Sequence, residues 1–417
     1  MSEHTEATVR TEVRAWLAEN WNPDLGLVQW RSLLADSGWG CPTWPRAQYG
    51  RGLPEPLAEV VREEFDRVGA IGVAQGGGTA LAAVTLLEHG SEEQKRAMLR
   101  PILTGEHTWC QLFSEPGSGS DLAGLTTRAD RDGDEYVVNG QKVWTTSAHH
   151  ARYGMLLART NWDVPKHQGI TYFAIEMDQP GVEVRPLRQM NGHASFNQVF
   201  FTDARVARAN VIAEVDRGWT VALTTLAHER RMADGLRSLV RAARGEGRIF
   251  EEYRREIASV MEPYKWYPQR AGRADLVVQR GRETGRLADP AVRQAVARVL
   301  ILARTAEWTA MRAKAARLLG RPPGPEGSLG KLAASHVARA AADAHALISG
   351  SDALLCGPDS PMGGVIAEVL VSVPAVSIAG GTDEIQRNIV GERVLGLPKE
   401  PADAGRPFRE VTRNVSS

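Results

Sequence analysis

The stretch WCQLFSEPGSGSD, residues 109–121, marks the place where the periodicity of the chain changes from helical to strand-like. From here the sequence breaks into short runs of β-branched and aromatic residues. The runs are separated by turn pairs such as Asp132-Gly133 and Asn139-Gly140, whose glycines supply the positive φ that hairpin turns need. The pattern predicts an antiparallel sheet or barrel that starts at this stretch.

On both sides of this block the apolar residues recur at helical spacing. One face of the first segment, TVRTEVRAWLAENW, carries Val9, Val13, Trp16 and Leu17. Ser91 followed by Gln94 has the spacing of a capping box at a helix start. After the strand-like block come long Ala/Leu/Arg-rich helices, which favour a bundle. RPPGPEGS, residues 321–328, is typical of a loop that separates two helices.

The fold class predicted from these patterns of periodicity is α+β, with three domains in the order helical, sheet, helical. Residues 245–287 are charged and poorly periodic, and we expect them to be only partly helical. The expected ranges are an N-terminal helical domain at 1–108, a central antiparallel β domain at 109–215, a C-terminal helical bundle at 216–400 and a tail at 401–417.

Composition excludes several classes of function. The chain has 417 residues and a formal net charge of zero, which argues against nucleic acid or anionic lipid as the main partner. Its three cysteines lie far apart and form no metal-binding spacing, so we expect no metal site and a reducing compartment. No apolar run is long enough to span a bilayer, and the N-terminus is polar. A cytoplasmic protein is expected.

Two common nucleotide-binding motifs are absent. The glycines of PGSGSD lack the third glycine of a dinucleotide fingerprint, because Leu122 stands at that position and strand-like sequence follows. Gly330-Lys331 is no P-loop, since Leu332 follows where Ser or Thr is needed. Any nucleotide must be held by another architecture.

Four segments, taken in order, indicate the function: QLFSEPGSGSD (111–121), KVWTTS (142–147), LAHER (226–230) and GGTDEIQRNIVGERVLG (380–396). Each alone has an ordinary structural explanation. Together they resemble the acyl-CoA dehydrogenase family over roughly residues 10–400. The resemblance implies a helix–sheet–helix fold, bound FAD, a CoA thioester substrate and removal of two hydrogens across its Cα–Cβ bond.

The resemblance also implies which residues bind FAD. Ser114 would reach the pyrimidine edge of the flavin, Trp144 would stack on the isoalloxazine, and Thr146 would donate toward N5. The full implied set is Gln111, Phe113, Ser114, Gly119, Ser120, Trp144, Thr146, Arg282, Thr382, Asp383 and Glu384. Thr382, Asp383 and Glu384 would lie at a helix N-terminus that faces the phosphate of FAD.

The α-proton of a thioester is weakly acidic, so the reaction needs a positioned carboxylate and a donor for the developing oxyanion. Many family members carry Glu where this chain has Gly380, whereas a minority place the base just before an Arg on the first helix after the sheet. Glu229 stands at that second position and is the candidate base. The alternative is a surface carboxylate paired with Arg230 or Arg231. The expected substrate-binding residues are Ser120, His228 and Arg230.

Gly380 can still act through its backbone N–H as an oxyanion donor, and its missing side chain leaves room for a branched or bulky acyl group. The family's Arg-x-x-Phe-Gly element is matched only by the stretch from Arg282 to Gly285, with Thr284 in place of Phe. The resemblance implies a homo- or hetero-tetramer and an electron-transfer flavoprotein as acceptor. Two alternatives remain open: a non-catalytic subunit of a heteromeric dehydrogenase, and a related flavin oxidase or hydroxylase that uses oxygen.

Overall fold

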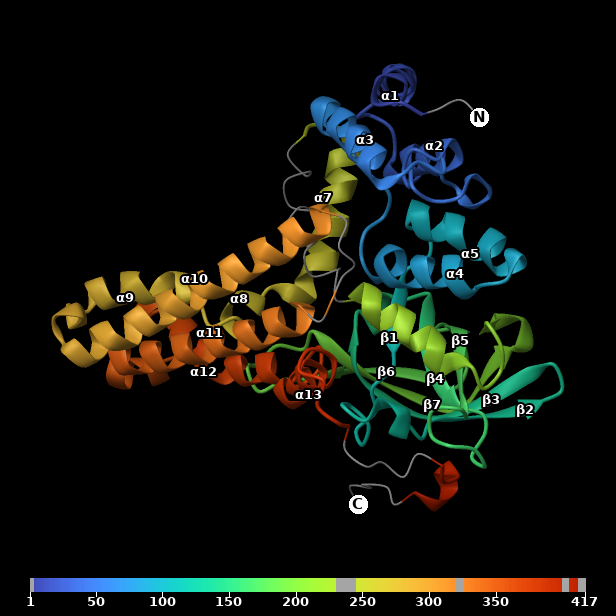
Figure 1. Ribbon diagram of the computed structural model, residues 1–417. Helices are drawn as coiled ribbons and strands as arrows, with labels where there is room; N and C mark the ends of the chain where they lie inside the picture. The colour runs from blue at the N-terminus through green and yellow to red at the C-terminus, as the bar shows by residue number, and fades with distance from the viewer. Residues whose placement is uncertain (1–3, 230–244, 320–323, 325, 400–404, 412–417) are drawn as a thin grey trace. The chain divides into compact units, whose positions relative to one another are not determined.

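The computed structural model describes residues 4–229, 245–319, 324, 326–399 and 405–411 (Figure 1). The chain divides into two compact units. Unit 1 consists of residues 1–187, 195–263 and 403–417, and unit 2 of residues 188–194 and 264–402.

Unit 1 begins with helices that bury one apolar face each. Val9, Val13 and Leu17 of the first helix are buried, as their spacing predicts. The predicted capping box is confirmed, because Ser91 Oγ accepts from the Gln94 N–H (3.2 Å) and Gln94 Oε1 accepts from the Ser91 N–H (2.9 Å). The helices are α1 (Glu6–Asn20), α2 (Leu27–Ser37), α3 (Glu55–Val68), α4 (Val84–His89), which continues a π-helical turn (Gly78–Ala83), and α5 (Glu92–Thr104).

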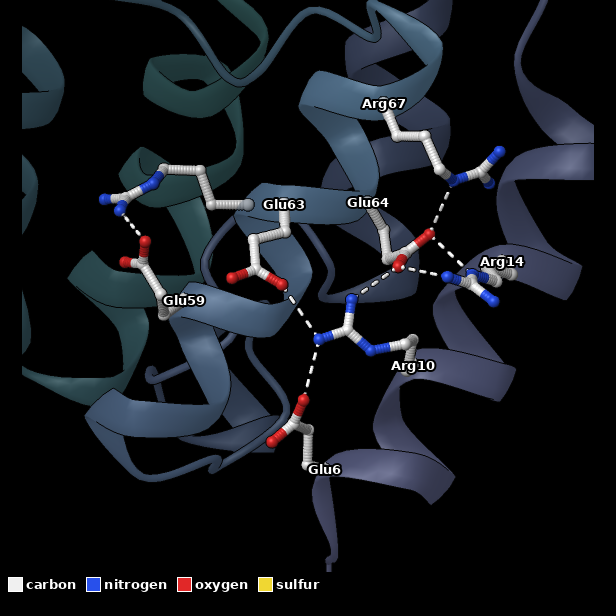
Figure 2. Close-up of polar contacts among 8 residues, drawn as sticks. Glu6, Arg10, Arg14, Glu59, Glu63, Glu64 and Arg67 are labelled. Atoms are coloured by element: carbon white, nitrogen blue, oxygen red, sulfur yellow. Dashed lines mark hydrogen bonds and ion pairs between the residues drawn. The ribbon is translucent and has the colours of Figure 1, made fainter.

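A buried carboxylate joins α1 to α3. Glu64 is 1% exposed and accepts hydrogen bonds from Arg10 (2.7 Å), Arg14 (2.7 Å) and Arg67 (2.8 Å), as Figure 2 shows. The hydrogen bond from Arg14, with those from Arg67 and Arg10, outweighs the cost of burial and lowers the pKa of Glu64 to about 2. The three guanidinium groups keep this carboxylate ionised in a place where an unpaired charge would be costly.

Helix α7 (Arg248–Met261) packs into the same core as α1–α3. Its apolar residues Ile249, Phe250, Tyr253 and Ile257 are buried there. Helix α7 therefore belongs to the core of unit 1, where the N-terminal helices cover its apolar face. The three domain ranges remain a prediction. The expectation of partial helicity in 245–287 is confirmed by α7 together with α8 (Tyr267–Arg270) and α9 (Val277–Glu283).

Among the described residues, eight strands form one sheet in the order β6-β7-β3-β2-β4-β5-β8, with β1 paired to β4. Most neighbours are antiparallel, as predicted, but β1 and β2 each pair with β4 in parallel. The strands are β1 (Trp109–Leu112), β2 (Arg128–Asp132), β3 (Glu135–Thr146), β4 (Tyr153–Arg159), β5 (Ile170–Glu176), β6 (Val182–Leu187), β7 (Phe196–Ala207) and β8 (Val211–Ile212).

The two glycine pairs predicted as turns have different roles. Gly133, with a φ of 61°, turns the β2–β3 hairpin as expected. The prediction for Asn139-Gly140 is wrong, because both residues lie inside β3, opposite a register shift in its pairing with β7. Gly140 is needed there for close packing, since a Cβ atom would lie 2.7 Å from the Cα of Thr127.

Unit 2 is a helical bundle whose core is built from small and β-branched residues. Val277, Val292, Val299, Ala341 and Ala344 are fully buried in it. Besides α8 and α9, its helices are α10 (Pro290–Leu318), α11 (Glu326–Ser349), α12 (Val365–Ser372) and α13 (Asp383–Arg393). Helix α10 ends before the loop predicted at 321–328, but α11 already begins inside this stretch, at Glu326. Residues 321–323 and 325 lie outside the described residues. Within the described part of the chain, no helix has the length and apolarity needed to cross a membrane.

Candidate active site

Strand β1 presents alternate residues to a helical layer of unit 1. Trp109 and Phe113 are buried in a core that also contains Val221 and Ala222 of the helix spanning 218–229. Because side chains alternate along a strand, Gln111 points to the same side as these two aromatic residues. Gln111 is partly buried. It therefore faces the helix that carries the candidate base.

The helix at 218–229 is fixed against the sheet by Thr225. Its hydroxyl lies 2.9 Å from that of Thr85 and 3.2 Å from that of Tyr172 in β5. Glu229 follows four residues later, on the same side of the helix. It is partly buried, and its Oε2 accepts from Gln111 Nε2 at 3.1 Å. The two arginines of the alternative surface pairing, Arg230 and Arg231, lie outside the described residues.

A bulge in β3 exposes Trp144. Lys142 pairs with Val199 and Thr145 with Asn197, so β3 has one extra residue between the two pairs. Such a bulge redirects a side chain. Trp144 has a φ of 60°, rare for a bulky residue, and its side chain is 56% exposed with one edge contact to Phe196.

Ser114 is tied to this bulge. Its carbonyl accepts from the Val143 N–H at 2.9 Å, so the 111–121 and 142–147 segments lie side by side. The hydroxyl groups near the bulge belong to Ser114 and Thr146, both partly buried, and to Thr145. The buried Oγ1 of Thr145 has no hydrogen-bond partner in the part of the chain that the structure describes. An exposed indole beside several hydroxyl donors suits a flat polar ring system.

A buried ion pair that sequence reasoning missed holds the same two segments together. Lys142 Nζ lies 2.8 Å from Glu115 Oε1 and donates to the Phe113 carbonyl at 3.0 Å, with Lys142 fully buried. Glu115 also accepts from the N–H groups of Thr126 (2.6 Å) and Thr127 (2.9 Å). Burial alone would raise the pKa of Glu115, but the charge and hydrogen bond of Lys142 outweigh it and lower the pKa to about 2.

The sequence does contain a signal for this pair. Lys142 stands at the strand spacing of the apolar Tyr136 and Val138, so it occupies an inward position of a predicted strand. A lysine there needs a buried carboxylate partner, and only the fold shows that Glu115 supplies it. The pair closes the 113–127 loop, which joins β1 to β2. Gly119 and Ser120 lie exposed on this loop, and a Cβ atom added to Gly119 would meet no atom of the described residues within 4 Å.

His228 and Arg230 are the other two residues predicted to bind substrate. His228 lies on the 218–229 helix with its Nε2 3.9 Å from Glu88 Oε2, so it points toward α4. Arg230, predicted to bind substrate, lies outside the described residues.

In unit 2, Gly380 and Gly381 have φ values of 69° and 86° and lead into α13. Thr382 caps this helix, its hydroxyl accepting from the Ile385 N–H at 3.3 Å. Gln386 Nε2 donates back to the Gly380 carbonyl at 3.2 Å. The residues before α13 therefore form an ordered turn at a helix N-terminus, as the prediction requires.

Asp383 and Glu384, which the resemblance implies as contacts of FAD, both have protein partners at the start of α13. Asp383 is 2% exposed, and its carboxylate accepts from Arg339 at 3.0 Å. Burial would raise the pKa of Asp383, but a hydrogen bond from Ser335 and the charge of Arg339 hold it below its ordinary value. This carboxylate anchors α13 to α11, since it is buried among its partners. Glu384 is exposed and pairs with Arg387, and Arg282 is exposed on α9.

Comparison with known proteins identifies the family. Models of the acyl-CoA dehydrogenase N-terminal, middle and C-terminal domains match residues 1–106, 110–204 and 273–395. Acyl-CoA dehydrogenase IpdE1 of Mycobacterium tuberculosis is 33% identical over 414 residues, which cover 94% of this chain and 97% of that protein. Among solved structures, the Tcur3481-Tcur3483 steroid ACAD aligns with a TM-score of 0.63 at 26% identity, covering 95% of this chain and 98% of the other.

The ChsE4-ChsE5 complex from Mycobacterium tuberculosis aligns with a TM-score of 0.59 at 26% identity and covers 96% of this chain and 100% of the other. The similarity extends over all three domains and nearly the full length, and it includes the segments that contain the bulge, the 113–127 loop and the turn before α13. This chain belongs to the acyl-CoA dehydrogenase family.

Proposed function

We propose that Glu229 is the base that removes the α-proton in an FAD-dependent α,β-dehydrogenation of an acyl-CoA thioester. The chain is an acyl-CoA dehydrogenase by its family and by the full-length similarity to named enzymes of that activity. The single observation that supports the assignment of the base is the contact of Glu229 with Gln111 on the inner side of its helix.

The residues of unit 1 fit the FAD on which this family depends. Trp144 offers an exposed indole for stacking, Ser114 and Thr146 offer hydroxyl groups beside it, and the open backbone at Gly119 allows close approach of a phosphate. Bound FAD supplies the acceptor for the hydride that leaves Cβ, at flavin N5. The strained Trp144 supports this reading, since such a conformation persists where function requires it.

The chain's own residues supply the acid–base part of the reaction. Glu229 takes the α-proton, and the Gln111 amide fixes the orientation of its carboxylate through the 3.1 Å hydrogen bond. We propose the Gly380 N–H as donor to the thioester oxygen, on which negative charge develops. Ser120, His228 and Arg230 remain proposed contacts of the CoA thioester.

We propose a branched or ring-bearing acyl group as substrate. Among the described residues, a Cβ atom added at Gly380 would meet only Lys331 Cε, at 3.8 Å, so the backbone there is open to them on its Cβ side. The structural relative named as a steroid ACAD adds support for a bulky substrate in this branch of the family. An electron-transfer flavoprotein is the proposed acceptor, and the cytoplasm the proposed location.

We also propose that the chain works as a homo- or hetero-tetramer. Structural relatives form complexes. Exposed large apolar side chains also gather in unit 2, with Leu300, Ile301, Trp308 and Met311 along α10.

Replacing Glu229 with Gln tests the assignment of the base. The substitution keeps the size and the contact with Gln111 but removes the proton acceptor, so we expect FAD to stay bound while its reduction by acyl-CoA slows by about 10²–10⁴-fold. The measurement is the loss of flavin absorbance in a single turnover with a panel of straight, branched and ring-bearing acyl-CoAs.

The matched control is Glu92→Gln, which removes an exposed carboxylate of α5 that pairs with Lys95 and should leave the rate unchanged. A Glu229→Gln variant that reduces its flavin at the normal rate would refute the assignment. Wild-type protein that binds no FAD would favour the non-catalytic subunit, and oxygen consumption with substrate would favour the oxidase.

A further inference from the structure

The segment 405–411 packs on unit 1. The Phe408 N–H donates to the Val164 carbonyl at 2.9 Å, and the Arg409 N–H donates to the Trp162 carbonyl at 3.1 Å. Arg409 also donates to Asp163 Oδ2 at 2.7 Å. The Phe408 side chain is only 1% exposed. These contacts seat the segment on the connection between β4 and β5.

Phe408 covers a buried arginine at the end of β4. The guanidinium carbon of Arg159 lies 3.5 Å from the centre of the Phe408 ring, and Arg159 is fully buried. The ring of Trp162 lies 5.5 Å from that of Phe408 and completes the aromatic cover. A cation over an aromatic face is stabilised most where water is excluded, so Phe408 helps to keep this charge inside the protein.

Arg159 in turn holds the 113–127 loop. It donates to the Ala123 carbonyl through Nη2 (2.7 Å) and to the Leu125 carbonyl through Nε (3.1 Å), and its own N–H donates to the Thr127 carbonyl (2.7 Å). Hydrogen bonds to a charged group are stronger than neutral ones. The guanidinium thus fixes the backbone that directly follows Gly119 and Ser120.

The loop is held from several directions by unit 1. Glu115 binds the N–H groups of Thr126 and Thr127, and Lys166 forms an ion pair of 2.6 Å with Asp121. Arg159 links two of these sites, since it also donates to the Lys166 carbonyl at 3.2 Å. Its own N–H donates to the carbonyl of Thr127, the residue whose N–H donates to Glu115.

We propose that the segment 405–411 is a positioning element of the cofactor site. Phe408 seals Arg159 into the protein, and Arg159 holds the 113–127 loop in the conformation in which Gly119 and Ser120 meet FAD. This inference rests on the proposed function for the cofactor, but the link between Phe408 and the loop stands on the contacts alone. Phe408 acts through Arg159, so it is a positioning residue.

The test compares Phe408→Ala with wild-type protein as purified, by hydrogen–deuterium exchange of peptides covering residues 117–127 and by the rate of FAD release after dilution. Loss of the ring admits water to Arg159 and weakens the hydrogen bonds from Arg159 to the backbone carbonyls of the loop. We expect exchange in 117–127 to accelerate about tenfold and FAD to leave about tenfold faster, which corresponds to 1.4 kcal/mol. Phe408→Leu, which keeps apolar volume without the aromatic face, should show both effects to a smaller degree and provides a folded variant.

The matched control is Phe250→Ala, which removes another buried ring, 5% exposed, from the core around α7. It should lower the melting temperature without changing exchange in 117–127 or the release of FAD. Exchange and release that are unchanged in both Phe408 variants would overturn the inference, as would equal changes in Phe250→Ala. If wild-type protein binds no FAD, the proposed cofactor fails, while the exchange of 117–127 still decides whether Phe408 holds the loop.

Discussion

Trp144 shows how one residue carries information about function. Its left-handed backbone costs about 1–2 kcal/mol for a residue with a Cβ atom, and its ring is more than half exposed, so neither packing nor backbone preference explains a tryptophan there. The cost is imposed by the bulge in β3 and by the hydrogen bond from Val143 to Ser114. A ligand that stacks on the indole would explain why it is present.

A pair of substitutions separates the backbone cost from the function of the ring. Trp144→Gly and Trp144→Ala both remove the indole, but only glycine adopts a φ of 60° without strain. We expect Trp144→Gly to be more stable than Trp144→Ala by about 1 kcal/mol in urea unfolding, and both to bind FAD more weakly than wild type. Equal stability of the two variants would mean that the backbone at 144 is not left-handed in solution.

At the scale of elements, Glu64 shows how helices of unit 1 are joined by charge as well as by apolar burial. The Glu64 carboxylate forms ion pairs with Arg10 and Arg14 of α1 and with Arg67 of α3 (Figure 2). Because its pKa is lowered from 4.5 to about 2, its ion pairs contribute stability that is fully present above about pH 4.5 and is lost as the pH falls toward 2.

Replacing Glu64 with Gln should therefore lower the free energy of unfolding by about 2 kcal/mol at pH 6. The difference in unfolding free energy between this variant and wild type should shrink as the pH is lowered from 5 to 3. Protonation of wild-type Glu64 then removes the ion pairs that the variant lacks. Urea unfolding across this range measures the effect. Glu63→Gln is the matched control, since Glu63 also pairs with Arg10 but is 53% exposed, and it should change stability by less than 1 kcal/mol.

At the scale of the whole molecule, α10 presents apolar side chains that its own unit does not cover. Ile301, Trp308 and Met311 are 64%, 62% and 62% exposed. If this surface is an interface between subunits, Trp308→Glu should shift the assembly from a tetramer to smaller species, since it would bury an unpaired charge. Light scattering after size exclusion measures the mass, and Val28→Glu, a change at an exposed valine of α2, is the control. A Trp308→Glu tetramer as stable as wild type would exclude α10 from the interface.

The sequence by itself determined the order of helices and strands, the capped start of α5 and the family, because these depend on local periodicity and on motifs that are contiguous in the chain. The side of its helix on which Glu229 lies could be inferred only once Thr225 was known to face the sheet. The sequence misplaced Asn139-Gly140, since a pair that turns a hairpin in isolation can also stand opposite a bulge.

Only the tertiary structure decided the contacts between residues distant in sequence. The pairing of Lys142 with Glu115, the burial of Asp383 against Arg339 and the cover of Arg159 by Phe408 join residues separated by 27, 44 and 249 positions. Because a buried charge is costly without a partner, each of these charged residues depends on one particular contact. A local sequence pattern cannot predict that contact when the partner is distant in the chain.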